Sequence, residues 1–192
     1  MRTVAVAEDE PITRMDICAM LEELGFSIAG EASDGFDAIE LCRRTKPDIA
    51  LLDVKMPVFD GLTAAETICR ENLATCVVML TAFSDEDIVA RAAEAGVTGY
   101  LVKPIDRSKL MPTIEVAYAQ ALRLRESREE AKKAQRQIAE DREIHKAQKL
   151  FARKLRCTET EAYEKMRKIA MDKRVPLYTI AKAVIEQEAG AR

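Results

Sequence analysis

Five residues with chemically active side chains follow, or end, short runs of apolar residues. They are three acids, one hydroxyl and one ammonium group: Glu8, Asp9, Asp53, Thr81 and Lys103. In an open α/β sheet the carboxyl ends of parallel strands meet at one edge, and ligands bind outside that edge. If the apolar runs are parallel strands, these five side chains converge on a single site.

The composition of this group points to metal and phosphate chemistry. Three neighbouring carboxylates repel one another and raise each other's pKa, so the cluster needs a cation. Oxygen ligands too few to enclose an ion favour Mg²⁺, which keeps several waters and shares a phosphate oxygen. Lys103 would add positive charge for a phosphoryl group, and Thr81 a hydrogen-bond donor. Because an aspartate can accept phosphate as an acyl phosphate, the centrally placed Asp53 is the candidate acceptor.

The first 105 residues alternate β-rich runs with helical patterns. Strands are predicted at Thr3–Ala7, Ser27–Glu31, Ile49–Leu52, Cys76–Thr81 and Thr98–Val102. Helices are predicted at 12–24, 35–45, 62–72 and 85–95, and a fifth helix begins near Arg107. Strands separated by helices of this length indicate parallel βαβ crossovers, and therefore an α/β fold with a doubly wound parallel sheet.

The rest of the chain is predicted to be helical. Residues 113–150 contain no Gly or Pro and are rich in helix-forming residues, which indicates one long helix. If this helix begins near Arg107, Pro112 falls in its second turn, where it removes a hydrogen bond and favours a bend. The apolar residues follow a heptad only in part, so a dimeric coiled coil and a solvated connector both fit.

A small three-helix unit is predicted after residue 140. Thr158 and Glu161 match a capping box at the start of the second helix, and Pro176 separates it from the third. Apolar residues at helical spacing form the expected core. They are Ile144, Ala147, Phe151, Leu155, Ala162, Tyr163, Met166, Ile169, Ala170, Leu177, Ile180, Ala181, Val184 and Ile185.

Charge divides the 192 residues into an acidic and a basic part. Residues 1–120 carry a net charge of −10 and residues 121–192 a net charge of +7, so the second part is a candidate for binding a polyanion. No apolar run has the roughly 20 residues of a membrane span. The acids that follow Ala7 interrupt any secretory signal, and we expect a cytoplasmic protein. Because the five cysteines form no CxxC pair and the chain has one histidine, the cysteines are expected to be core residues.

Four separated motifs resemble, in order, the receiver domain of two-component response regulators. They are Glu8-Asp9-Glu10-Pro11, Leu51 to Pro57 with Asp60-Gly61, Leu80-Thr81-Ala82, and Gly99 to Pro104. The resemblance covers residues 1–120. It implies a flavodoxin-like, five-stranded receiver in which a sensor histidine kinase phosphorylates Asp53.

The same resemblance implies roles for the remaining residues of the site. Mg²⁺ would be held by Glu8, Asp9, Asp53 and the backbone carbonyl of Lys55. Thr81 and Lys103 would bind the phosphoryl group, and Tyr100 would change rotamer on activation. Glu8 stands where Asp is commoner in the family. The family also implies a cis peptide bond between Lys103 and Pro104.

Residues 161–174, followed by Ile180-Ala181, resemble the ANTAR domain. This is a three-helix RNA-binding module of transcription antitermination. The resemblance covers about 126–187, within a segment at 121–187 that starts as a helical, coiled-coil linker. The family's Ala-Lys-Gly in the first helix is replaced here by Ala147-Gln148-Lys149. The whole chain resembles receiver–ANTAR regulators of the ethanolamine-utilisation type.

Basic residues provide candidate RNA contacts. Four of them form a stripe on the long helix, on the side away from its apolar residues: Arg142, Lys146, Lys149 and Arg153. Lys173 and Arg174 lie between the last two helices. Phosphate contacts would supply the affinity. A solvated helix face would show the same pattern.

Two other classes of protein fit part of this pattern. An enzyme of the haloacid-dehalogenase class needs a second Asp two residues after the nucleophile, where this chain has Lys55. A DNA-binding transcriptional regulator is the stronger alternative, because the last two helices resemble a helix-turn-helix. We interpret the chain as a non-enzymatic response regulator with the sensor histidine kinase, Mg²⁺ and RNA hairpins as partners. It would form a homodimer on phosphorylation and act as an antiterminator.

Overall fold

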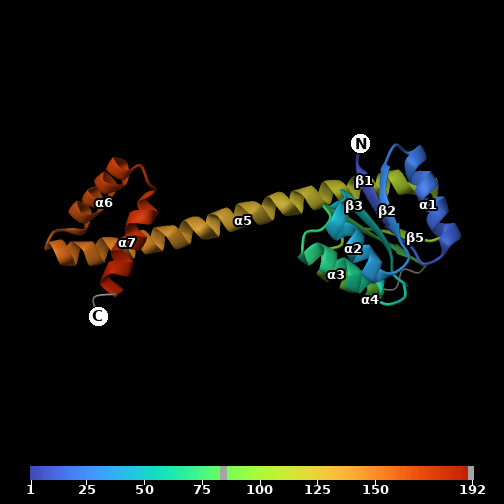
Figure 1. Cartoon of the computed structure of the whole chain (residues 1–192), viewed down its shortest axis with the longest axis horizontal. Helices are drawn as coiled ribbons and strands as arrows, with labels where there is room; N and C mark the ends of the chain where they lie inside the picture. The colour runs from blue at the N-terminus through green and yellow to red at the C-terminus, as the bar shows by residue number, and fades with distance from the viewer. Residues whose placement is uncertain (83–85, 190–192) are drawn as a thin grey trace. The chain divides into compact units, whose positions relative to one another are not determined.

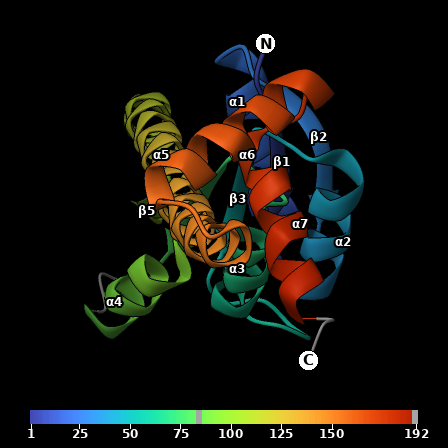
Figure 2. The ribbon, with the colours of Figure 1, turned by 90° about the vertical axis from the view of Figure 1, so that its left-hand side faces the viewer.

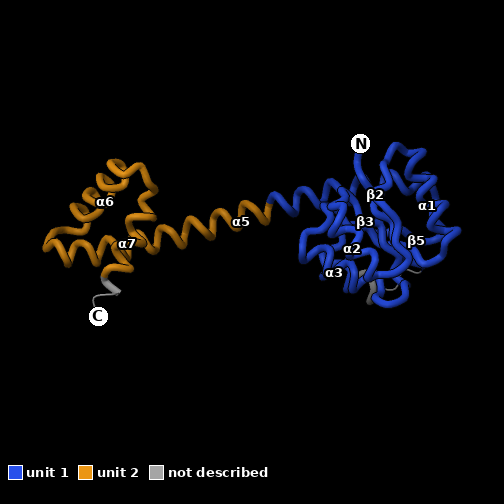
Figure 3. Tube along the Cα trace, viewed as in Figure 1, with its two compact units in different colours: residues 1–126 blue, residues 127–192 orange. Residues whose placement is uncertain are grey.

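The computed structural model describes the backbone of residues 1–82 and 86–189, with side chains at 1–82 and 90–187. The chain divides into two compact units, residues 1–126 and 127–192 (Figure 3). Each unit has its own core. No helix in the described part of the chain combines the length and apolar character of a membrane span.

The first unit contains a five-stranded parallel sheet (Figure 1). Its strands are β1 (Thr3–Ala7), β2 (Ser27–Ala32), β3 (Ile49–Asp53), β4 (Cys76–Thr81) and β5 (Gly99–Val102). The strand order is β2-β1-β3-β4-β5. This is the flavodoxin-like order, in which the direction of winding reverses between β1 and β3. The predicted α/β sheet is confirmed, and each predicted strand lies within one residue of the observed one at either end.

Helices cover both faces of this sheet. They are α1 (Pro11–Glu23), α2 (Gly35–Thr45), α3 (Gly61–Arg70), α4 (Glu86–Ala95) and the first turns of α5 (Arg107–Leu155). One hydrophobic cluster joins the sheet to α2, α3 and α4, and the other joins it to α1 and α5. The predicted helix at 85–95 began one residue earlier than α4, and that residue lies outside the described part.

The central strands are apolar because both of their faces are covered. Every residue of β3 and of β4 is buried, including the polar residues that end them, Asp53 and Thr81. Continuous apolar runs of this kind are typical of strands in parallel sheets. The two polar ends therefore emerge at the edge of the sheet where ligands bind.

The predicted long helix is confirmed as α5, a single helix of 49 residues that includes Pro112. Four of its residues pack into the core of the first unit: Leu110, Ile114, Ala117 and Ala121. Every residue from 122 to 139 is exposed. Arg2 helps to hold the start of α5, because its guanidinium pairs with Glu115 and lies 4.4 Å from the centre of the Tyr118 ring.

The second unit packs the end of α5 against α6 (Glu159–Lys173) and α7 (Leu177–Ala189), which a short turn joins (Figure 2). Its fully buried centre is Ala147, Met166 and Ala181, one residue from each helix. The predicted capping box is confirmed, since Thr158 accepts from the Glu161 backbone and the Glu161 side chain accepts from Thr158.

The prediction that Tyr163 and Leu155 belong to the helical core is wrong. Tyr163 is 37% exposed and Leu155 is 41% exposed. With only three helices, one narrow stripe of α6 is covered, at residues 162, 166 and 170, and Tyr163 flanks it. Leu155 is the last residue of α5, where the neighbouring helices no longer cover it.

All five cysteines lie in the described part of the chain, and none of them forms a disulfide bond. Cys18, Cys42 and Cys76 are buried, as expected for core residues, and burial raises their pKa to about 11, 12 and 11. Cys69 in α3 and Cys157 before α6 are half-buried. The core prediction therefore holds for three of the five.

Candidate functional site

Three carboxylates meet at the carboxyl ends of β1 and β3, which are neighbours in the sheet. Glu8 and Asp9 follow β1 directly, and Asp53 is the last residue of β3. One carboxylate oxygen from each residue lies within 4.8 Å of the other two. Glu8 and Asp53 are buried, whereas Asp9 is exposed. The sequence therefore predicted the members of this cluster and the edge of the sheet on which they meet.

Lys103 reaches into this cluster from the end of β5. Its Nζ lies 2.6 Å from Oε2 of Glu8 and 3.1 Å from Oδ1 of Asp53. Its backbone N–H donates to the carbonyl of Thr81 at 2.7 Å, and its peptide bond to Pro104 is cis, as the family resemblance implied. The ammonium group is thus held between two of the three acids.

The protonation of these groups reflects their burial and their closeness. Burial raises the pKa of Asp53, and the nearby Lys103 opposes this only in part. Burial likewise raises the pKa of Glu8, and the charge of Asp53 adds to the effect. Burial alone would lower the pKa of Lys103, but its contacts with Glu8 and Asp53 outweigh it and raise that pKa. The lysine is therefore charged at neutral pH, but its single positive charge does not fully offset the effect of burial on the pKa of the two acids.

The donor set fits a hard divalent cation. All three side chains offer oxygen, which Mg²⁺ prefers. Oε2 of Glu8 is fully buried, and the Lys103 ammonium lies 2.6 Å from it. A carboxylate oxygen has two lone pairs, so the contact with Lys103 leaves Oε2 of Glu8 able to bind a metal or its water.

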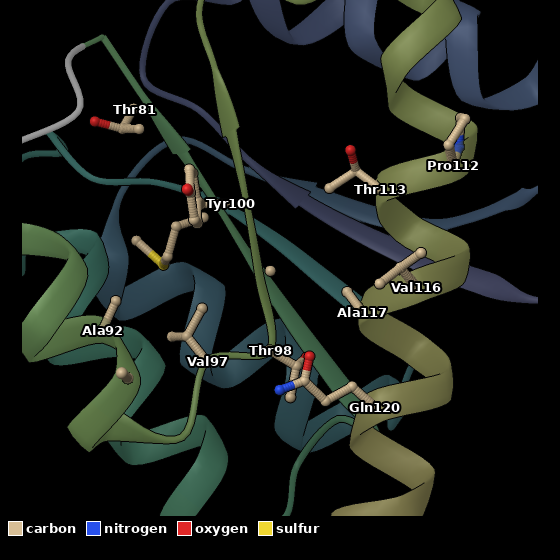
Figure 4. Close-up of a pocket in the computed structure, with 13 residues that line it drawn as sticks. Thr81, Ala92, Val97, Thr98, Tyr100, Pro112, Thr113, Val116, Ala117 and Gln120 are labelled. Atoms are coloured by element: carbon tan, nitrogen blue, oxygen red, sulfur yellow. The ribbon is translucent and has the colours of Figure 1, made fainter.

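Thr81 and Tyr100 lie on β4 and β5, the two strands that follow β3 in the sheet. Thr81 is buried at the end of β4, one strand away from Asp53. Tyr100 on β5 is 52% exposed. Both line a cavity of about 520 Å³ between α4, β5 and α5 (Figure 4). Val116 and Gln120 of α5 also line this cavity. A residue next to the acids and an exposed ring thus share one cavity.

The loop after β3 is held close to Asp53. Gly61 donates its N–H to the carbonyl of Val54 at 2.9 Å. A Cβ at Gly61 would lie 1.8 Å from the backbone oxygen of Asp53, so only glycine fits there. Asp60 caps α3 by accepting from the backbone of Thr63. Lys55, whose carbonyl the family resemblance assigned to the metal, lies in this loop and is exposed.

Arg14 is a residue of this site that the sequence did not reveal. Its Nη1 donates to the backbone carbonyl of Glu8 at 2.6 Å, and its Nε donates to Oε2 of Glu31 at 3.0 Å. Its position near the start of a helix gives no sign of these contacts, which arise when α1 folds back over β1 and β2.

The candidate RNA-binding residues lie in the second unit and are all exposed. Arg142, Lys146, Lys149 and Arg153 share one side of α5, away from the buried Ala147. Lys173 ends α6, and Arg174 forms its C-cap in the left-handed conformation with φ 55°. These positions make the six side chains accessible to a large ligand.

Comparison with known proteins identifies the family. The profile described as "Response regulator receiver domain" matches residues 4–115, and the one described as "ANTAR domain" matches residues 132–185. The transcriptional regulatory protein PdtaR of Mycobacterium tuberculosis is 40% identical over 185 residues, which are 96% of this chain and 90% of PdtaR. The chain is a response regulator with a receiver domain and an ANTAR domain.

Other similarities concern the receiver domain of this response regulator. The transcriptional regulatory protein LiaR of Bacillus subtilis is 35% identical over a region that covers 61% of this chain and 56% of LiaR. Two solved structures each match 62% of this chain. The receiver domain of NarL from M. tuberculosis has 30% identity, a TM-score of 0.58 and 96% coverage. The receiver domain of the sensor histidine kinase PA1611 from Pseudomonas aeruginosa, solved with a magnesium ion in its active site cleft, has 27% identity, a TM-score of 0.55 and 98% coverage.

Proposed function

We propose that this response regulator accepts a phosphoryl group on Asp53 from a sensor histidine kinase and controls transcription by binding RNA as an antiterminator. In the transfer, the bond from phosphorus to the kinase's histidine nitrogen breaks as a bond to a carboxylate oxygen of Asp53 forms. The observation that carries the proposal is the position of Lys103, whose ammonium contacts Glu8 and Asp53, the two buried acids of the cluster.

Four groups of the receiver would hold Mg²⁺: the carboxylates of Glu8, Asp9 and Asp53, and the backbone carbonyl of Lys55. The closeness of the three carboxylates and the remaining lone pair of the buried Glu8 Oε2 support this assignment. The bound ion would neutralise charge on the transferred phosphoryl group. The assignment also agrees with the magnesium ion in the active site cleft of the related receiver domain from P. aeruginosa.

Lys103 and Thr81 would bind the phosphoryl group once it is on Asp53. Lys103 already contacts Asp53, so its ammonium needs only a small movement to meet a phosphoryl oxygen. Thr81 is buried at the neighbouring strand end and offers a hydroxyl. Tyr100 would be the switch residue, because its ring lines the same cavity as Thr81 and can change rotamer when Thr81 moves.

The output would come from the ANTAR domain, within a chain that we divide into a receiver at 1–120 and a linker-plus-ANTAR segment at 121–187. Phosphorylation would favour a homodimer through the receiver and α5, whose exposed stretch from 122 to 139 leaves it open to a second helix. Arg142, Lys146, Lys149, Arg153, Lys173 and Arg174 would contact RNA phosphates. Sedimentation should show a larger mass after phosphorylation, and an unchanged mass would contradict the dimer.

The phosphoacceptor is tested by measuring intact mass after incubation with acetyl phosphate and Mg²⁺. Wild type should gain one phosphoryl group, and Asp53→Asn none. Asp60→Asn is the matched control, because Asn also serves as an N-cap and the change leaves the acidic cluster intact. Phosphorylation of Asp53→Asn to the wild-type level, with the same need for Mg²⁺, would exclude Asp53.

The RNA surface is tested by titrating hairpin RNA and duplex DNA at matched salt. Lys149→Ala, Arg153→Ala and Arg174→Asn should each weaken RNA binding, and each should flatten the slope of log K against log salt by about 0.7. Asn is used at 174 because it tolerates the left-handed backbone. Lys132→Ala, elsewhere on α5, is the control. Tighter binding of duplex DNA than of RNA would favour a DNA-binding regulator instead.

A further inference from the structure

A single guanidinium joins the loop that carries two of the acids to the neighbouring strand. Arg14 lies in the first turns of α1, and its Nη1 donates to the carbonyl of Glu8 at 2.6 Å. Its Nε donates to the Glu31 carboxylate on β2 at 3.0 Å. The Arg14 side chain is 17% exposed, so most of it is removed from water. The Glu31 side chain is 47% exposed, and hydrogen bonds from a charged donor such as this guanidinium are shorter and stronger than those between neutral groups.

The carbonyl of Glu8 needs a donor because the sheet ends there. The N–H of Glu8 still pairs with the carbonyl of Ala32, at 3.1 Å. Ala32 is the last residue of β2, and β1 itself ends at Ala7. Arg14 supplies a donor for this carbonyl, and the planar fork of arginine lets it bond Glu31 at the same time. The peptide between Glu8 and Asp9 is thereby fixed from one side.

We propose that Arg14 is a positioning residue of the metal site, which sets the orientation of the Glu8 and Asp9 carboxylates by holding the peptide that joins them. The inference rests on the proposed function, in which both acids hold the divalent cation. Arg14 itself does not contact the ion. Partners of this kind, one step behind the ligands, commonly change metal affinity 10- to 100-fold when they are lost.

The sign of the effect separates positioning from charge. Arg14 carries a positive charge beside a site that binds a cation, so by Coulomb's law alone its removal should tighten metal binding. If Arg14 positions the two acids, its removal should weaken binding. Arg14→Met keeps much of the apolar stem and removes both the charge and the two hydrogen bonds. The two explanations therefore predict opposite changes for one variant.

The test is a titration with Mn²⁺ alone, followed by the electron paramagnetic resonance signal of the free ion. It reports binding without any phosphoryl transfer. Wild type should bind one ion, and Arg14→Met should bind about tenfold more weakly. Arg43→Met is the matched control, because Arg43 also pairs with two acids, Glu40 and Glu71, but on the exposed side of α2. It should bind Mn²⁺ as wild type does.

Unchanged or tighter binding by Arg14→Met would overturn the inference. Failure of wild type itself to bind Mn²⁺ would instead overturn the metal site of the proposed function. Thermal unfolding establishes that each variant is folded. If Arg14→Met does not fold, Arg14→Lys replaces it, since a lysine keeps the charge but lacks the fork that spans Glu8 and Glu31. Wild-type affinity in Arg14→Lys would overturn the inference in the same way.

Discussion

Gly61→Ala should displace Asp53, the proposed phosphoacceptor, without changing any acid. The added Cβ would lie 1.8 Å from the backbone oxygen of Asp53, whereas ordinary contact begins at 3.4 Å. The two segments must therefore separate by about 1.6 Å. Neither can yield cheaply, because the clash is with the backbone of a buried central strand. Met79 on β4 blocks a second direction, since its Cε would be 3.0 Å away.

The cost of this displacement can be worked out from the same contacts. Forcing extra volume into a packed site costs about 1–3 kcal/mol. Breaking the hydrogen bond from Gly61 to Val54 adds about 1 kcal/mol. We expect the free energy of unfolding to fall by about 2–4 kcal/mol. A 1 Å error in the position of a reacting group can cost about 100-fold in rate, so phosphorylation by acetyl phosphate should slow by about that factor.

The assays are urea unfolding and the time course of intact mass with acetyl phosphate and Mg²⁺. Gly25→Ala is the control, because Gly25 has φ +87° but no atom within 4 Å of an added Cβ. It should lose about 1–2 kcal/mol through backbone strain alone, with an unchanged phosphorylation rate. Wild-type stability and rate in Gly61→Ala would refute the reasoning.

Four further changes have defined outcomes. Because burial raises the pKa of Asp53, Asp53→Asn should raise the free energy of unfolding at pH 7. This gain should shrink as the pH falls towards the ordinary pKa range of an aspartate, because the folded state protonates the wild-type acid before the unfolded state does. A gain that stays constant in urea unfolding down to that range would contradict this cause. Thr158→Ala should lower the stability of the ANTAR domain by about 1 kcal/mol, measured by thermal unfolding. Met166→Ala leaves a cavity at the centre of three helices and should cost about 2–5 kcal/mol, with loss of helical signal in the ANTAR domain. A double-mutant cycle of Arg2→Met and Tyr118→Leu should give a coupling of about 0.5–1 kcal/mol, and additive effects would exclude the cation–π contact.

The strands and the acids were predictable from the sequence because they depend on local pattern. The apolar runs that end in Asp53 and Thr81 are buried on both faces, and such runs identify central strands without any tertiary information. Parallel strands then require their carboxyl ends to share an edge. The strand order did not follow from pattern alone, and it was the resemblance to receiver domains that implied it.

Contacts between elements were not predictable in the same way. The bonds from Arg14 to the Glu8 carbonyl and to Glu31 depend on how α1 packs over two strands, and no local spacing encodes this. The prediction that Tyr163 is buried was wrong for a related reason. Its helical spacing fits an apolar face, but the width of the buried stripe depends on how many helices cover it, and here Tyr163 lies outside that stripe.

The unequal burial of the thiols provides built-in reporters of folding. At pH 8, a thiol with a pKa of about 11 is a thiolate only about once in a thousand molecules, so Cys18 and Cys76 should resist alkylation in the folded protein, and Cys42 more so. Cys69 and Cys157 are more accessible and lie in different units. Alkylation with an isotopically labelled reagent, read peptide by peptide, would thus follow the unfolding of the first unit through its three buried thiols, with Cys69 and Cys157 as the more accessible references.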